Sequence, residues 1–188
     1  MLFSQAHRAY NNDLLTPMAQ DDAVAKLARQ IDAAHQAEHA RRSAEEVFAL
    51  RRRGAQELHE ICADFVTSVN SRLAAAALDI APPSFGPEMF RESGVNLIQI
   101  GSQGRQMHIS FQAPAQLVST EKFAMAYVLE GEIRTFNQQM LERFEIRTRS
   151  LFCCVEEKTA VWRSFDWRSA NLSVVTRDFL ASLMEPLF

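Results

Sequence analysis

The chain has 188 residues, of which 47% are hydrophobic and 23% are charged, and its formal net charge is −3. This size and composition suffice for a hydrophobic core, so the fold needs no disulfide or metal to hold it together. Acidic and basic residues are balanced on both sides of Pro82. This balance argues against a protein that binds nucleic acid through a basic surface, because phosphate contacts supply most of that affinity.

The cysteines and the N-terminus indicate where the chain is found. Cys62, Cys153 and Cys154 are odd in number and two of them are adjacent, so they form no disulfide framework and fit a reducing compartment. The N-terminus lacks the positive start and apolar run of a signal peptide. No segment approaches the roughly 18 consecutive apolar residues of a membrane span. We therefore expect a soluble, cytoplasmic protein with no membrane segment.

The first part of the chain is predicted to be helical. Residues 18–81 contain no proline and one glycine, Gly54, and Thr16-Pro17 is a good helix start because threonine can cap the helix and proline suits its first position. Two apolar stripes at helical spacing follow. The first consists of Val24, Leu27, Ala28, Ile31 and Ala34, and the second of Val47, Leu50, Leu58, Ile61, Phe65, Val69 and Leu73.

The relation between the two stripes favours two helices. At about 100° per residue, one straight helix would turn the stripes about 180° apart. Ser43-Ala44-Glu45-Glu46 also has the pattern of a capping box, which predicts a break near residues 38–43. The alternative is one long helix, because no glycine or proline supplies a stop there. Such a rod would need a partner helix along its length.

The second part of the chain has the alternation of a sheet. Three prolines stand between residues 82 and 87, and single hydrophobic residues alternate after them. The expected strands cover 95–100, 105–112, 123–136, 143–155 and 159–167, and a helix follows within 172–184. We expect an α+β fold with an N-terminal long helix or helical pair, an antiparallel sheet of about five strands, and a C-terminal helix packed on the sheet. The predicted regions are a helical arm or hairpin (1–81), a connector (82–94), and the sheet with its covering helix (95–188).

One short motif suggests a metal. His35-x-x-Glu38-His39 resembles the inverted zinc-protease signature, in which two histidines on one helical face bind Zn²⁺ and the glutamate activates water. The resemblance covers five residues and fixes three of them, and no downstream motif identifies a third ligand. We interpret these residues as solvated positions of an alanine-rich helix and expect no metal or other cofactor.

Arg51-Arg52-Arg53 is the strongest basic cluster. It could contact phosphate or an acidic partner, but nearby glutamates favour a solvated face that is partly paired within the helix. Arg51 is the exception because it falls inside the second apolar stripe. We expect its aliphatic part to lie along apolar surface or its guanidinium to pair at an interface.

No motif supports catalysis. The sequence has no phosphate-binding loop, nucleophile elbow or dinucleotide fingerprint, and adjacent cysteines in a strand point to opposite faces. The first hypothesis is therefore a non-catalytic protein-interaction or assembly module that uses its amphipathic helical arm, as a homo-oligomer or with a protein partner. The expected contacts are Val47, Leu58, Ile61, Phe65 and Val69.

The second hypothesis is a small-ligand binding or enzymatic domain with a pocket between the curved sheet and a helix. A large cavity would favour it, whereas a filled core would favour the interaction module. The residues expected at the pocket are His108, Tyr127, Arg134, Arg147 and Trp162. Nucleic-acid binding comes third, because the aromatic residues that would stack bases fall on the buried side of the predicted sheet.

Overall fold

The computed structural model describes residues 18–75, 77–114, 126–156 and 159–188, without the side chains of 18–22 and 37–42. The chain divides into two compact units, residues 1–43 and 44–188. The second unit contains the C-terminal part of the first helix, the connector and the whole sheet. The predicted residues 123–125 lie outside the described part of the chain.

The first helix, α1, covers Met18–Asn70 and is 53 residues long. Its first residue, Met18, is also the first residue that the structure describes. The predicted break near residues 38–43 is wrong, because the backbone stays helical through this segment and Ser43 lies inside the helix. The reason is local: every residue there tolerates a helix, and no glycine or proline ends one. A capping-box sequence is compatible with a helix interior when nothing terminates the preceding turn.

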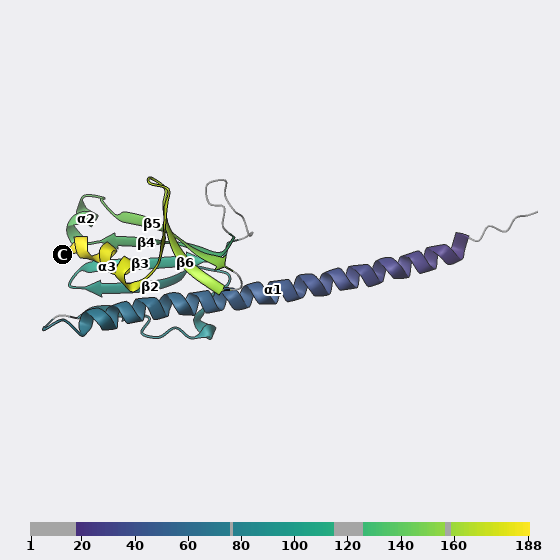
Figure 1. The fold of residues 1–188 in the computed structure, drawn as a ribbon, viewed down its shortest axis with the longest axis horizontal. Coiled ribbons are helices and arrows are strands. Elements are labelled where there is room, and N and C mark those ends of the chain that lie inside the picture. The colour runs from purple at the N-terminus through teal and green to yellow at the C-terminus, as the bar shows by residue number, and fades with distance from the viewer. Residues whose placement is uncertain (1–17, 76, 115–125, 157–158) are drawn as a thin grey trace, which may run out of the picture. The chain divides into compact units, whose positions relative to one another are not determined.

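The sheet is a seven-stranded antiparallel meander in the order β1-β2-β3-β4-β5-β6-β7 (Figure 1). Its strands are β1 (Asp79–Ala81), β2 (Asn96–Ser102), β3 (Arg105–Gln112), β4 (Tyr127–Phe136), β5 (Arg147–Glu156), β6 (Thr159–Asp166) and β7 (Asn171–Val174). The α+β class is confirmed, with two strands more than expected. The additional strands, β1 and β7, stand at the two edges and are too short to show an alternation of their own.

Short helices complete the fold. They are η1 (Pro87–Met89), α2 (Gln138–Glu142), α3 (Arg177–Met184) and η2 (Glu185–Leu187). The side chain of Thr176 accepts a hydrogen bond from the Phe179 backbone N–H and so caps α3. Leu180 and Met184 of α3 are buried in the core, which confirms that the C-terminal helix packs on the sheet.

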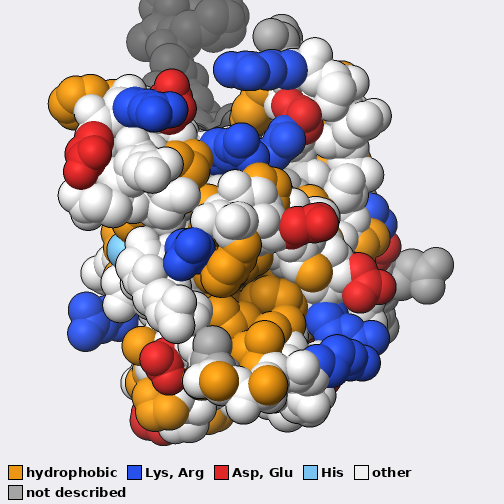
Figure 2. All heavy atoms as spheres, turned by 90° about the vertical axis from the view of Figure 1, so that its left-hand side faces the viewer, with side chains coloured by type: hydrophobic (Ala, Val, Ile, Leu, Met, Phe, Trp, Pro, Cys, Tyr) orange, Lys and Arg blue, Asp and Glu red, His pale blue; other side chains and the backbone are white. Residues whose placement is uncertain are grey.

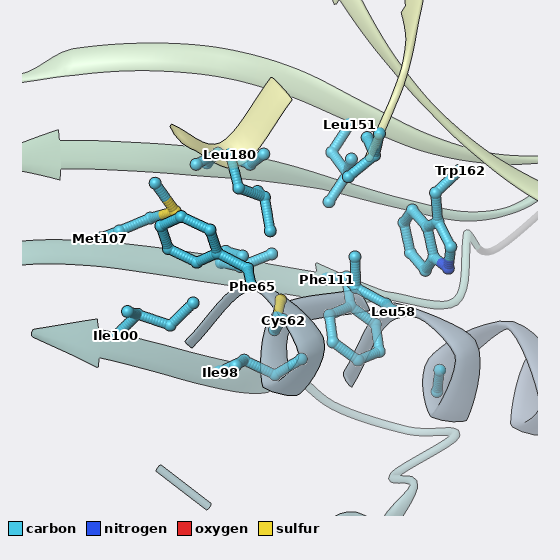
Figure 3. Packing of buried hydrophobic residues seen from close by; sticks show 14 of the residues in the cluster. Leu58, Cys62, Phe65, Ile98, Ile100, Met107, Phe111, Leu151, Trp162 and Leu180 are labelled. Atoms are coloured by element: carbon cyan, nitrogen blue, oxygen red, sulfur yellow. The ribbon is translucent and has the colours of Figure 1, made fainter. Parts of the chain in front are cut away.

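The core lies between α1, α3 and one face of the sheet. Leu58, Cys62 and Phe65 of α1 are fully or almost fully buried, and Figure 3 shows them against side chains of the sheet and of α3. The neighbouring side chains labelled there are Ile98, Ile100, Met107, Phe111, Leu151, Trp162 and Leu180. The second apolar stripe therefore has its partner within the same chain.

Gly54, the single glycine of α1, marks a close approach of helix and sheet. A Cβ atom added at Gly54 would lie 2.6 Å from Cys153 Sγ, well inside contact distance. The indole Nε1 of Trp162 donates a hydrogen bond of 2.6 Å to the Gly54 carbonyl oxygen. A side chain here would move the helix off the sheet, so packing explains a residue that helix propensity disfavours.

Arg51 and its neighbours hold α1 to the connector. The Arg51 guanidinium pairs with Glu92 and donates from Nε to the Val128 carbonyl oxygen at 3.0 Å, so Arg51 pairs within its own chain. His59 Nε2 lies 2.8 Å from the Pro82 carbonyl oxygen. The Arg52 Nε donates to the Pro87 carbonyl oxygen at 3.1 Å. Two of the three clustered arginines thus make contacts within this chain.

Candidate functional site

The first apolar stripe of α1 is exposed. Val24, Leu27 and Ile31 have exposed fractions of 68%, 57% and 51%, and every described side chain from 23 to 36 is exposed. Hydrophobic residues at this spacing normally cover a helix face that packs against something. Within the described part of unit 1–43, this face has no neighbour.

The residues predicted to contact a partner lie elsewhere. Leu58 is fully buried and Phe65 is 2% exposed, both within the core of residues 44–188. Val47, Ile61 and Val69 are partly buried and pack against the same core. All five pack against the core of their own chain, whereas the large hydrophobic residues of the first stripe are exposed. Its residues were visible in the sequence, but the sequence does not show which stripe the sheet covers.

The five residues predicted to share a pocket are distributed over four places. His108 and Arg134 are direct partners across β3 and β4 on the sheet face opposite the core. Trp162 is 2% exposed within the core, and Tyr127 belongs to a separate small cluster with Cys154 and Phe165. Arg147 alone lines a large cavity.

His108 sits in a partly buried polar site of its own. Its Nε2 lies 3.2 Å from Gln99 Nε2, and its ring meets the ring of Phe136 edge-on at 4.9 Å between centroids. Burial, and next the positive charge of Arg134, lower the pKa of the His108 imidazole below its usual value. A neutral imidazole beside an arginine is suited to hydrogen bonding within the sheet face.

The cavity that contains Arg147 has a volume of about 700 Å³. It lies between the beginning of β5, the end of β6, and α3 with η2. Its lining residues are Ile133, Thr135, Ile146, Arg147, Thr148, Arg149, Ser150, Phe165, Asp166, Trp167, Arg168, Ser182, Leu183 and Pro186. A pocket of this size is typical of small-molecule sites, which commonly enclose about 300–1,000 Å³.

The lining of this cavity has more positively charged than negatively charged side chains. Arg149 and Asp166 form an ion pair with an N–O distance of 2.5 Å. A hydrogen bond from the Arg168 backbone N–H, and then the Arg149 side chain, lower the pKa of the Asp166 carboxyl to about 2, so Asp166 stays ionised near neutral pH. Among the described residues, neither Arg147 nor Arg168 has an acidic partner. The lining therefore carries two uncompensated positive charges.

A second hollow is apolar. Figure 2 shows hydrophobic side chains gathered in a hollow on the face at the left of Figure 1, where the C-terminus lies. A groove of about 290 Å³ is lined by Phe65, Val69, Leu73, Leu78, Met184 and Phe188, among others. The Arg105 guanidinium lies 4.5 Å from the centre of the Phe188 ring, and Arg105 Nε donates to the Leu187 carbonyl oxygen. Arg105 thereby holds the C-terminal residues beside this groove.

The described residues include neither a cluster of metal ligands nor an exposed thiol. No group of three or more His, Cys, Asp or Glu residues among the described side chains could hold a metal ion. His35 is exposed, whereas the side chains of Glu38 and His39 lie outside the described part. All three cysteines are buried and free. Burial raises the pKa of the Cys62 thiol to about 12 and that of Cys154 to about 11, so neither is a reactive thiolate at neutral pH.

Comparison with protein-family models, curated proteins and solved structures finds no match for this chain. None of the described helices is long and apolar enough to cross a membrane. Two features of the described chain are candidates for a functional site: the exposed stripe of α1 and the arginine-lined cavity.

Proposed function

We propose that this protein is a non-catalytic assembly module in which residues 18–36 of α1 pair with the same segment of a second copy of this chain. The observation that carries the proposal is the exposed stripe of Val24, Leu27 and Ile31. Three large hydrophobic side chains on one face of a helix lose contact with water only if another surface covers them. The other apolar stripe of α1 already packs on the sheet, so the first stripe is the free one.

The order of residue types supports a second copy as the occupant. Val24 and Ile31 occupy the first position of a heptad, and Leu27 and Ala34 occupy the fourth. β-branched residues at the first position and leucine at the fourth favour parallel two-stranded coiled coils. In such a pair, each of these side chains meets its own equivalent, so the same short pattern supplies both sides of the contact.

The flanking positions are compatible with this pairing. The residues beside the stripe are Ala23, Ala28, Gln30 and His35, and in a parallel pair His35 falls opposite Gln30 of the other copy, so no two like charges meet. Lys26 and Asp32 lie on the opposite side of the helix, where they remain in water. The small alanine side chains also allow two helix backbones to approach closely.

The expected affinity is modest. Each fully buried Val, Leu or Ile contributes about 1.5–3 kcal/mol, and the stripe supplies only three large side chains per chain, against a substantial entropic cost of association. We therefore expect a dissociation constant of about 10–100 µM, which corresponds to roughly 5.5–7 kcal/mol. Assembly then depends on the concentration of the protein.

Light scattering coupled to size-exclusion chromatography tests the proposal on the full chain. The wild type should shift from monomer to dimer as its concentration rises through the high micromolar range. Leu27→Gln combined with Ile31→Gln should remain monomeric, whereas Lys26→Gln, which changes the opposite side of the helix, should dimerise like the wild type. A wild type that is strictly monomeric, or a double variant that dimerises normally, would overturn the proposal.

Cross-linking tests the parallel arrangement. In a parallel pair, two copies of Leu27→Cys face each other within the range of a disulfide, about 4.4–6.8 Å between Cα atoms. The three natural cysteines are buried, so the introduced thiol dominates the reaction. Leu27→Cys should give a covalent dimer under mild oxidation, whereas Asp32→Cys, on the solvent side, should not. Equal cross-linking of both variants would contradict the parallel pair.

A further inference from the structure

We propose that the cavity between β4–β6 and α3 binds a small organic anion, a carboxylate or phosphate attached to an apolar group. Arg147 and Arg168 would bind the anion, and the hydrophobic lining would contact the apolar group. This site lies wholly within residues 44–188 and does not depend on the pairing of α1. Of the residues that the sequence placed at a ligand pocket, only Arg147 lies here.

The arginines of β5 lie on the face of the strand whose other residues point into the core. Side chains alternate along a strand, so Arg147 and Arg149 lie on the same face of β5 as the fully buried Leu151 and Cys153. The register agrees, because Arg147 is paired with Thr135 and Arg149 with Ile133, which are 3% and 1% exposed. The inward-facing row therefore changes from hydrophobic residues to arginines where the cavity begins.

This change in residue type places two exposed cationic side chains, Arg147 and Arg168, beside the apolar part of the lining. Their guanidinium groups are hydrated in the free protein and accessible to a ligand. Asp166 neutralises Arg149. No described acidic side chain pairs with Arg147 or Arg168. A bound anion would supply the missing partner.

Guanidinium groups determine the kind of anion. Arginine donates in a planar fork that matches the two oxygens of a carboxylate or phosphate, and such charge-assisted hydrogen bonds are stronger than neutral ones. Thr148 supplies a hydroxyl group in the same lining. Carboxylate and phosphate share this chemistry, so the site is defined by an anionic group with at least two acceptor oxygens.

The apolar residues of the lining determine which uncharged group the ligand carries. Ile133, Leu183 and Pro186 present apolar surface from β4, α3 and η2. Trp167 is 50% exposed, and its indole Nε1 donates to Ser150 Oγ at 2.6 Å, which fixes the ring at the cavity. A volume of about 700 Å³ exceeds what an inorganic anion needs. An aromatic or aliphatic group attached to the anion would use this space.

Titration calorimetry with three matched probes tests the site on the full chain. The probes are 2-naphthyl phosphate, 2-naphthoate and uncharged 2-naphthol, which share one ring system. At least one anion should bind, and the naphthol should bind about tenfold more weakly, as expected if charge-assisted hydrogen bonds contribute. The anion with the higher affinity shows whether the site prefers a phosphate or a carboxylate. Absence of binding by both anions at millimolar concentration would overturn the proposal, as would equal binding of the naphthol.

Variants assign the binding to this cavity. Arg147→Gln combined with Arg168→Gln should weaken the better anion by about tenfold or more, because two ionic hydrogen-bond donors are lost. Arg72→Gln is the matched control, since Arg72 is exposed and does not line the cavity. The exposed positions of Arg147 and Arg168 make loss of folding unexpected, and circular dichroism verifies this. Unchanged affinity in the folded double variant would place the anion elsewhere and overturn the proposal.

Discussion

The two parts of α1 show how differently one kind of sequence pattern can be used. Residues 18–43 and 44–70 both carry an apolar stripe at helical spacing, and both belong to one helix. In the second part the stripe packs on the sheet, with Leu58 fully buried. In the first part Leu27 is 57% exposed. The spacing of the apolar residues therefore predicts that a helix face is hydrophobic, but it does not predict which surface covers that face.

The side chains around the stripes are more informative than the stripes themselves. The second part also contains Gly54, which allows close contact with the sheet, and Arg51, which binds across to Glu92 and Val128. Such features fit one particular neighbour. The first part has alanine, glutamine and one histidine, His35, beside its stripe, a general helix surface that suits another helix. Substitutions in the two parts should consequently have different effects.

The largest difference is expected for leucine truncation. Leu58→Ala should lower the free energy of unfolding by about 2–5 kcal/mol, because it leaves a cavity in the filled core. Leu27→Ala should change it by less than about 0.5 kcal/mol for the monomer, since the side chain is exposed. Chemical denaturation at low micromolar concentration, where the proposed dimer dissociates, measures both. Similar losses for the two variants would show that the first stripe packs within its own chain.

A smaller effect is expected for Gly54→Ala. Alanine favours a helix by about 1 kcal/mol, but its Cβ would overlap Cys153 Sγ, and overpacking commonly costs about 1–3 kcal/mol. We expect a net loss of stability by thermal or chemical unfolding. In a Cys153→Ala background, which removes the sulfur, the same substitution should be neutral or stabilising. If Gly54→Ala stabilised the otherwise wild-type protein, the close approach at this residue would be wrong.

A glycine substitution in the exposed part of α1 tests the opposite case to Gly54→Ala. Ala25→Gly in the exposed part of α1 should reduce helix content in circular dichroism, because glycine costs about 1 kcal/mol in a helix interior. It should leave the unfolding of residues 44–188 unchanged, since Ala25 belongs to the other unit. A lowered unfolding midpoint for the sheet would instead show that the two units unfold together.

Much of the fold could be predicted because its signals are local. The alternation of Met107, Ile109 and Phe111 predicts a strand, and the helical spacing up to Met184 predicts α3, although the predicted range started at Leu172, which lies in β7. The continuity of α1 was missed because opposite stripes suggest two cores, whereas one of these stripes does not pack on the described core. The edge strands were missed because strands of three or four residues take their structure from a neighbour rather than from their own pattern.

The candidate sites were harder to predict because they depend on contacts between distant residues. Arg147 and Arg168 come together with Leu183 only when β5, β6 and α3 meet at one end of the sheet. The sequence does contain one signal: in β5, arginines continue the row of Leu151 and Cys153. This signal can be recognised only when it is known which face of β5 points into the core, and the sheet register defines that face.

The smallest effect on stability, but a large contrast in reactivity, is expected for thiol labelling. Leu27→Cys should scarcely change stability, and its exposed thiol should react with a disulfide reagent at pH 8. Cys62 should not react in the native protein, because it is fully buried and burial raises its pKa to about 12. Labelling of the introduced cysteine should increase about tenfold per pH unit below its ordinary pKa of about 8.5, as the thiolate fraction does.

The outcome distinguishes the two parts of α1 without perturbing the core. Labelling of Cys62 should require opening of the sheet–helix core and therefore follow global unfolding in denaturant. At high protein concentration, the reaction of Leu27→Cys should slow as the proposed dimer covers the stripe, whereas Asp32→Cys should react at the same rate throughout. A rate for Leu27→Cys that is independent of concentration would leave the stripe exposed in solution and contradict its role in assembly.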